Sequence, residues 1–212
     1  MADSLEDTLE ERVVWPSWLF TEMKTNHIGE LAAVFMYIGA QRALILKFKL
    51  LSFCPYFIKY KEPIKKAMNF VRRQVETETV HFKIMSSLLP QTHQTRFCFF
   101  WRINAFLLGF LPTFIAGPRA LYWTVYAVEK FVEKHYNSQI IKIILEKLPV
   151  PSLLSLLKNF KEDEVYHQRE AAEHLYGRFD HPAILNPAII SKVWTNLVYY
   201  GSLWAAELVR WI

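Results

Sequence analysis

The chain has 212 residues, of which 52% are hydrophobic, 16% aromatic and 21% charged. A composition this apolar excludes an intrinsically disordered protein and supplies enough side chains for a sizeable core. The chain has six glycines, which excludes collagen-like and other glycine-rich repeat designs. The length favours a single domain.

The net charge of +5 is unevenly distributed along the chain. Residues 1–12 contain five acids and one Arg, whereas residues 13–212 carry 24 Lys and Arg against 15 Asp and Glu. We therefore interpret residues 1–16 as an acidic N-terminal extension and residues 17–212 as one helical domain. The extension resembles neither a hydrophobic signal peptide nor an Arg-rich transit peptide.

Long stretches with helical periodicity, separated by proline and glycine, predict an all-α chain. Pro63 and Pro151 stand at first-turn positions and Pro90 follows a helix, in agreement with the usual preferences at helix ends. Most of the predicted helices are about 40 Å long or longer, which favours a bundle with long walls. The predicted helices cover residues 17–50, 63–89, 93–110, 118–147, 151–176 and 186–211.

Basic and aromatic residues are interleaved from Arg42 to Arg73, a strip with nine Lys or Arg and one acid. Such a pattern is typical of surfaces that bind anionic lipid, because the cations meet headgroups while the rings enter the interface. It also occurs in nucleic-acid-binding proteins and on solvated helix faces. The apolar character of the remaining chain favours the membrane, and we expect no nucleic-acid partner.

The longest charge-free apolar run, Ile103–Pro118, has 16 residues. A spanning helix needs about 20. We interpret the run as a pair of interfacial segments or a bent core helix. The prediction is therefore peripheral membrane contact through Phe97–Trp123 together with Arg42–Arg73.

Two of the predicted helices carry a Glu and a His, three residues apart, in the middle of an otherwise apolar face. These pairs are Glu78 with His81 and Glu164 with His167. A Glu-x-x-His pair presents a carboxylate and an imidazole on the same side of a helix, where both reach one metal ion. The pairs therefore indicate metal binding.

The helix before each pair has an acid on its apolar face, Glu30 in one case and Glu129 in the other. A buried carboxylate without a partner costs several kcal/mol, so each needs one. One Glu from each of two helices and a Glu-x-x-His from each of the other two form the ligand set of ferritin-like di-iron carboxylate bundles. We therefore expect an all-α, ferritin-like four-helix bundle with two additional helices, one of them at a membrane interface. Such an oxygen-rich set suits iron or manganese. The predicted metal ligands are Glu30, Glu78, His81, Glu129, Glu164 and His167.

Short motifs surround these residues. They are NHIGEL at 26–31, the Glu78/His81 pair, AVE at 127–129, HYNSQI at 135–140 and DEVYH at 163–167. In this order they resemble the demethoxyubiquinone hydroxylases of ubiquinone biosynthesis, and the similarity covers roughly residues 20–212. The most specific motif is HYNSQI, six residues after Glu129.

The resemblance implies a di-iron monooxygenase that uses O2 to hydroxylate the ring of a polyprenyl quinone, with two iron ions and with NADH as the reductant. It implies a peripheral enzyme on the matrix side of the mitochondrial inner membrane, or at a bacterial cytoplasmic membrane. It also implies a lipid-binding helper protein of the same pathway. On the resemblance, His135 and Tyr136 act in gating or in the delivery of protons and electrons.

The chain departs from the family pattern around two of the motifs. Asn26 stands where the family has Asp, and Ile28 stands where it has Ala. Residues 115–123 replace a segment of small residues before Glu129. The ligand residues are unaffected, but the preference for a particular quinone is left open.

Aromatic residues near the expected site are candidates for a quinone cavity, although such residues also form ordinary core. The predicted substrate contacts are Tyr37, Phe114, Tyr122 and Tyr126.

Two rival functions are another ferritin-like oxidase or iron store, and a non-catalytic lipid- or quinone-binding partner. Iron storage needs acidic, soluble channels, and a non-catalytic relative is expected to have lost ligands.

Overall fold

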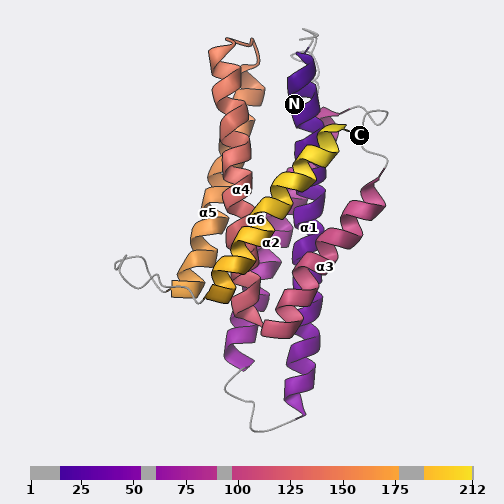
Figure 1. The fold of residues 1–212 in the computed structure, drawn as a ribbon, viewed down its shortest axis with the longest axis vertical. Helices are drawn as coiled ribbons and strands as arrows, with labels where there is room; N and C mark the ends of the chain where they lie inside the picture. The colour runs from indigo at the N-terminus through magenta and orange to yellow at the C-terminus, as the bar shows by residue number, and fades with distance from the viewer. Residues whose placement is uncertain (1–14, 54–60, 90–96, 177–188, 212) are drawn as a thin grey trace, which may run out of the picture.

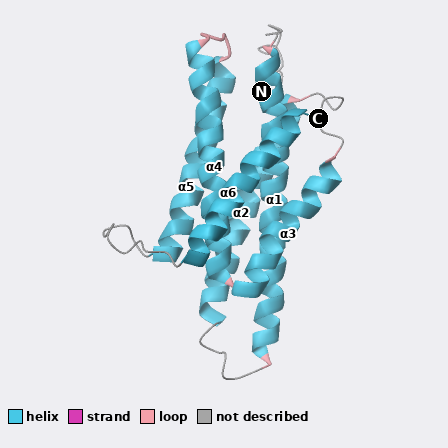
Figure 2. Ribbon diagram, viewed as in Figure 1, coloured by secondary structure: helices cyan, strands magenta, loops and turns pink. Residues whose placement is uncertain are grey.

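The computed structural model describes residues 15–53, 61–89, 97–176 and 189–211. These ranges form helices and no strand, which confirms the all-α fold class (Figure 2). The predicted extension over residues 1–16 lies almost wholly outside the described residues. The helices are α1 (Ser17–Ser52), α2 (Lys61–Leu88), α3 (Cys98–Ala116), α4 (Pro118–Leu145), α5 (Pro151–Tyr176) and α6 (Ile189–Trp211).

Four long helices, α1, α2, α4 and α5, form the bundle, and α3 and α6 cross it obliquely (Figure 1). α1 packs on α2, and α4 packs on α5. α3 lies along α1, while α6 contacts both α4 and α1. This is the predicted arrangement of a four-helix bundle with two additional helices.

The apolar core consists of two main clusters at different heights of the bundle. One contains Tyr37, Phe70 and Tyr122, and the other contains Tyr136 and Phe160. Burying a large apolar side chain stabilises the fold by about 1.5–3 kcal/mol, so these clusters fix the four helices relative to one another. On each long helix, the predicted ligands come between residues of one cluster and residues of the other. The core therefore holds the ligand-bearing turns from both sides.

The third helix differs from its prediction over residues 93–110. It continues through Pro112 to Ala116, so all but the last two residues of the charge-free apolar run form a single helix, as in the second of the two interpretations, and not two segments. Lys47 Nζ donates hydrogen bonds to the carbonyl oxygens of Phe114 (2.9 Å) and Ile115 (3.4 Å). Carbonyl groups at a helix end lack partners within the helix, and this lysine of α1 supplies them. The contact with α1 thus caps the helix just after Pro112.

α1 and α3 cross with their backbones in contact at two glycines. A Cβ atom on Gly39 would lie 2.1 Å from the carbonyl oxygen of Phe106. A Cβ atom on Gly109 would lie 1.8 Å from the carbonyl oxygen of Met36. The clashing atoms belong to helix backbone, so they move only if a helix moves. Glycine at these positions therefore sets how closely α3 approaches the bundle.

Replacing Gly109 with Ala is expected to lower the free energy of unfolding by about 2–3 kcal/mol, because the methyl group forces α3 away from α1. Urea denaturation followed by far-UV circular dichroism measures the change. Gly201→Ala on α6 is the matched control, since a Cβ there has no atom within 4 Å. Helix propensity predicts that the control gains up to about 1 kcal/mol. A Gly109→Ala variant as stable as the wild type would contradict the close crossing.

Two helices, α1 and α3, are long and apolar enough to cross a membrane by length and composition. In α1, 44% of the apolar window is buried inside the protein, against 22% in α3. Core helices pass the same test, and α1 is the central helix of the bundle. The exposed hydrophobic surface of α3 is the more informative of the two for membrane contact.

Candidate metal centre

All six predicted ligand residues lie near the middle of the four long helices, and the structure brings them together. α1 contributes one, α2 two, α4 one and α5 two. Each is between 1% and 3% exposed, as expected for the polar interruptions of apolar helix faces. The residues are Glu30, Glu78, His81, Glu129, Glu164 and His167.

The six residues form two overlapping groups. In each group, one candidate ligand atom per residue lies within 4.8 Å of the others. Glu78 and Glu164 belong to both groups, so they stand where carboxylates would bridge two ions. The first group is completed by Glu30 and His81, and the second by Glu129 and His167.

The imidazoles point at the shared carboxylates. His81 Nδ1 lies 3.8 Å from Glu78 Oε2 and 3.5 Å from Glu164 Oε1. His167 Nδ1 lies 3.1 Å from Glu78 Oε1 and 3.4 Å from Glu164 Oε2. Each shared carboxylate thus presents one oxygen to each histidine. This geometry matches two adjacent metal positions with one imidazole at each.

Several ligand atoms are buried without a hydrogen-bond partner in the described part of the chain. They are Glu30 Oε2, both carboxylate oxygens of Glu78, and the Nδ1 atoms of His81 and His167. Leaving such groups unpaired is costly, and a carboxylate costs most. Divalent cations would supply partners and neutralise the carboxylates, so the residues fit the metal ions that the sequence predicts. That these residues bind metal stays a prediction.

Burial and mutual charge shift the pKa values of the cluster. Burial, together with the charge of Glu164, raises the pKa of Glu78 to about 8. Burial also raises the pKa of Glu129 well above its usual range. For His81, burial lowers the pKa, but the carboxylates of Glu164 and Glu30 outweigh it and raise the pKa to about 11. Protons therefore balance the carboxylates in the metal-free protein, and metal ions would displace them.

Two tyrosines donate hydrogen bonds to the carboxylates that are not shared. Tyr37 Oη donates to Glu129 Oε1 at 2.7 Å, and Tyr136 Oη donates to Glu30 Oε1. Both tyrosines are almost fully buried. Each of these glutamates therefore has one oxygen held by a phenol.

Asp163 holds one of the histidines from outside the cluster. Its Oδ2 atom lies 3.1 Å from His81 Nε2, and the His81 ring stacks on Phe160 with the ring centroids 4.0 Å apart. Such contacts orient a ligating histidine and leave its other nitrogen for the metal. The sequence signal for Asp163 was its place directly before Glu164, but its role was not predicted.

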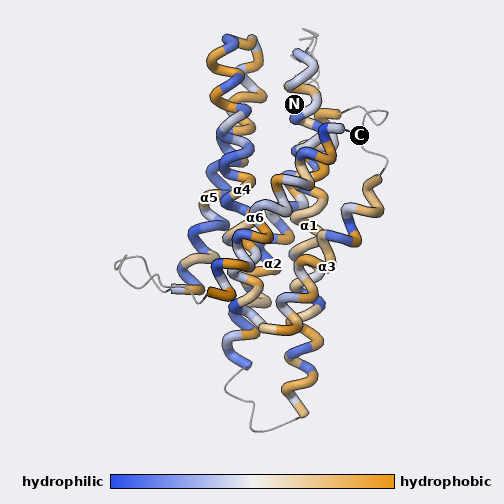
Figure 3. Tube along the Cα trace, viewed as in Figure 1, coloured by the Kyte–Doolittle hydropathy of each residue, from blue (hydrophilic) through white to orange (hydrophobic). Residues whose placement is uncertain are grey.

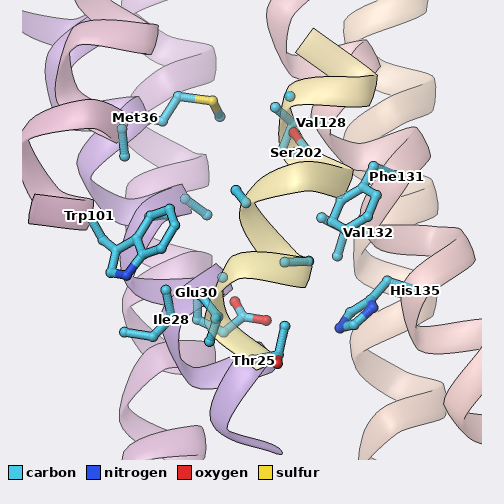
Figure 4. A pocket seen from close by; sticks show the side chains of 18 of the residues that line it. Thr25, Ile28, Glu30, Met36, Trp101, Val128, Phe131, Val132, His135 and Ser202 are labelled. Carbon is cyan, nitrogen blue, oxygen red and sulfur yellow. The ribbon is translucent and has the colours of Figure 1, made fainter. Parts of the chain in front are cut away.

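An apolar cavity of about 590 Å³ adjoins the ligand cluster. Figure 4 shows Trp101 of α3 on one side and Phe131, Val132 and His135 of α4 on the other, with Glu30 between them. Residues of α1 and α6 complete the wall. A cavity with apolar walls and a few polar groups at one place is typical of a small-molecule site. Four of the predicted ligands line it: Glu30, Glu78, Glu129 and Glu164.

The four aromatic residues predicted as substrate contacts are not among those that line this cavity. Tyr37 holds Glu129 from the core side. Tyr122 is buried and stacks on the exposed His174, at 4.5 Å between ring centroids. Phe114 stacks on Phe110 and Tyr126 packs on Trp123. Since these contacts are made elsewhere, the cavity does not support the substrate role, which stays a prediction. The four residues are Tyr37, Phe114, Tyr122 and Tyr126.

His135 lines the cavity within a buried hydrogen-bond network. Its Nε2 atom lies 2.9 Å from Asn26 Oδ1, and Arg210 Nη2 of α6 lies 3.4 Å from its Nδ1 atom. Arg210 also pairs with Glu22 of α1 at 2.9 Å. Burial lowers the pKa of His135 to about 4, so the imidazole is neutral at pH 7. Asn26, a departure from the family pattern, bonds Gln139 Oε1 at 2.9 Å and so belongs to the same network.

Comparisons with known proteins agree with the resemblance seen in the motifs. Residues 56–198 match the family described as "Ubiquinone biosynthesis protein COQ7". A 3-demethoxyubiquinol 3-hydroxylase of Bordetella pertussis is 28% identical over 84% of this chain and 71% of its own length. The protein of Dictyostelium discoideum named "NADPH-dependent 3-demethoxyubiquinone 3-hydroxylase, mitochondrial" is 24% identical over 85% of this chain and 71% of its own.

A bovine protein with the same name as the Dictyostelium one is 30% identical over 108 residues. That match spans about half of each protein, 49% in both cases. The family match itself covers well over half of the chain and includes five of the six candidate ligands. The chain therefore belongs to the COQ7 family of ubiquinone biosynthesis proteins.

Proposed function

We propose that this protein is a monooxygenase that hydroxylates the ring of a demethoxyubiquinone, a polyprenyl benzoquinone, in ubiquinone biosynthesis. The observation that carries the proposal is the pair of buried ligand groups that share Glu78 and Glu164 beside an apolar cavity. The similarity to relatives named as hydroxylases of demethoxyubiquinone or demethoxyubiquinol supports it. The alternatives of an iron store and a non-catalytic binding protein lack such support.

We infer that the resident metal is a pair of iron ions. Glu30 and His81 would hold one ion, Glu129 and His167 would hold the other, and Glu78 and Glu164 would serve both. When bound, two ferrous ions would supply electrons for the reduction of dioxygen and so the oxidising power that ring hydroxylation needs. The contribution of the protein is to fix these side chains in a dry core and to place the substrate beside them.

The cavity is the place where this chain would hold a quinone ring. Its apolar wall excludes water. Glu30 belongs both to this wall and to the ligand cluster, and it accepts a hydrogen bond from Tyr136, another residue of the wall. His135 also faces the cavity and is held neutral by burial. These positions support a role for His135 and Tyr136 in gating or in proton and electron delivery at the substrate.

The reductant is a nicotinamide cofactor in this proposal. The motif resemblance implies NADH, whereas the bovine and Dictyostelium relatives are named as NADPH-dependent. Initial rates of cofactor oxidation with each compound, measured with substrate present, decide between them.

We propose that the protein contacts the membrane peripherally through α3 and α6. The outer surfaces of these helices expose large apolar side chains, with Phe99 at 74%, Ile115 at 75% and Trp204 at 75%. In Figure 3 hydrophobic residues predominate along α3 and recur along α6. Large exposed apolar patches mark interaction surfaces. Of the two segments that the sequence predicted, Phe97–Trp123 contributes most of this surface.

The basic strip Arg42–Arg73 would add electrostatic attraction to anionic lipid. Six of its basic residues are exposed: Arg42, Lys49, Lys65, Lys66, Arg72 and Arg73. Residues 54–60 lie outside the described part. Each Lys or Arg near an anionic surface contributes about 1 kcal/mol. We propose the location that the motif resemblance implies, the matrix side of a mitochondrial inner membrane or a bacterial cytoplasmic membrane. The same resemblance implies a lipid-binding helper protein that delivers the substrate.

The test is hydroxylation of a short-tailed demethoxyquinone under 18O2, with the iron-loaded protein and NADH or NADPH. The expected product is heavier by one atom of 18O, as mass spectrometry detects. Transfer of 16O from water, or no product from a folded iron-loaded protein, would overturn the proposed activity.

A further inference from the structure

Two hydrogen bonds repeat the same pattern on opposite sides of the ligand cluster. Tyr37 of α1 donates to Glu129 of α4, and Tyr136 of α4 donates to Glu30 of α1. Each helix thus supplies a ligand residue and also the phenol that holds the ligand residue of the other helix.

The spacing of these residues explains why the pattern is reciprocal. On both helices the tyrosine follows the glutamate by seven residues, close to two turns, so both side chains lie on one face. α1 and α4 run in opposite directions in Figure 1. In an antiparallel pair, the start of one such segment lies opposite the end of the other. Tyr37 and Tyr136 therefore occupy equivalent positions in a structural motif that occurs once on each helix.

The two tyrosines differ in their surroundings. Tyr136 is part of the cavity wall, whereas Tyr37 is not. Tyr37 is fully buried in the core, and its ring packs edge-on against Phe70 with the centroids 6.4 Å apart. A substrate in the cavity would touch Tyr136 but not Tyr37. The only ligand residue with which Tyr37 forms a hydrogen bond among the described residues is Glu129.

We propose that Tyr37 is a positioning residue for the second metal ion: its hydroxyl fixes Glu129 so that one carboxylate oxygen is held by the phenol and the other is available to the ion bound by His167. The sequence had assigned Tyr37 to the substrate. Its position instead directs its effect to one half of the metal centre.

Loss of the Tyr37 hydroxyl would free the Glu129 side chain to rotate. Glu129 is 1% exposed, so water cannot replace a lost hydrogen bond to its Oε1 atom. Without the phenol, the carboxylate would rotate towards another donor or present both oxygens to the ion. Partners of this kind change metal affinity by about 10–100-fold when removed. The loss should fall on the ion of Glu129 and His167 and spare the ion of Glu30 and His81.

The experiment is an anaerobic Co²⁺ titration of the full chain, read by the visible absorption of the bound ion. It rests on the two-ion site of the proposed function, so the wild type is titrated first and is expected to bind two ions. In Tyr37→Phe, the ion of Glu30 and His81 should bind as in the wild type. The ion of Glu129 and His167 should bind about 10-fold more weakly or worse. Phenylalanine keeps the ring against Phe70, so the variant is expected to fold.

Two further variants make the result specific. Tyr122→Phe removes a buried tyrosine hydroxyl that, unlike that of Tyr37, has no hydrogen-bond partner among the described residues, and this variant should bind both ions normally. His167→Ala keeps only the group of Glu30 and His81, so its spectrum identifies that ion. The ion retained by Tyr37→Phe should have the same spectrum.

The outcomes separate this inference from the proposed function. A wild type that binds no Co²⁺ pair would overturn the proposed function. A normal wild type with a Tyr37→Phe variant that binds both ions as tightly would overturn only the role of Tyr37. A retained ion whose spectrum differs from that in His167→Ala would overturn it as well.

Discussion

Replacing Glu164 with alanine is expected to remove both metal ions and to lower the hydroxylation rate by about a thousandfold or more, equivalent to about 4 kcal/mol. Glu164 belongs to both ligand groups, so its loss damages both metal positions at once. Both imidazoles face its carboxylate, Nδ1 of His81 at 3.5 Å and Nδ1 of His167 at 3.4 Å. The measurements are metal content per chain and the initial rate of product formation.

Glu162→Ala is the matched control for this variant. It removes the same group two residues earlier on α5, at an exposed position outside both ligand groups. Metal content and rate should equal those of the wild type. A Glu164→Ala protein that still holds two ions and hydroxylates normally would contradict the assignment of the shared carboxylates.

Filling the cavity with a larger side chain is expected to lower the hydroxylation rate without removing the metal. Val132 of α4 lies on the cavity wall, and tryptophan at this position would occupy the space in which the ring is expected to bind (Figure 4). Misplacing a substrate by about 1 Å costs about 100-fold in rate, so a loss of at least that size is expected. Metal content should stay unchanged, because Val132 belongs to neither ligand group.

Ile141→Trp on the same helix controls for the added bulk, since Ile141 is exposed and does not line the cavity. It should hydroxylate at the wild-type rate. Full activity in Val132→Trp with normal metal content would show that the substrate binds elsewhere.

The helices could be predicted because their signals are local. Apolar periodicity and proline positions located α1, α4 and α5 to within about two residues of their observed ends. α3 could not be located as well, because Pro112 normally ends a helix. The turn after Pro112 is capped by Lys47, which lies far away in the sequence and meets this turn only in the folded chain.

The six candidate ligands could also be found from sequence, because each is a polar residue on an apolar helix face and the helical spacing places Glu and His together. The cavity could not be found this way. Its wall depends on the angle at which α6 crosses α4, which periodicity does not encode. For the same reason Tyr37 was assigned to the substrate, although its hydroxyl reaches Glu129 on another helix.

The most direct test of the di-iron centre is the iron content of the wild-type chain after anaerobic reconstitution with ferrous iron and removal of unbound metal. The two overlapping ligand groups predict two irons per chain, with a Mössbauer spectrum of two high-spin ferrous ions. A folded wild type that retains no stoichiometric iron would contradict the di-iron centre and the hydroxylase that depends on it.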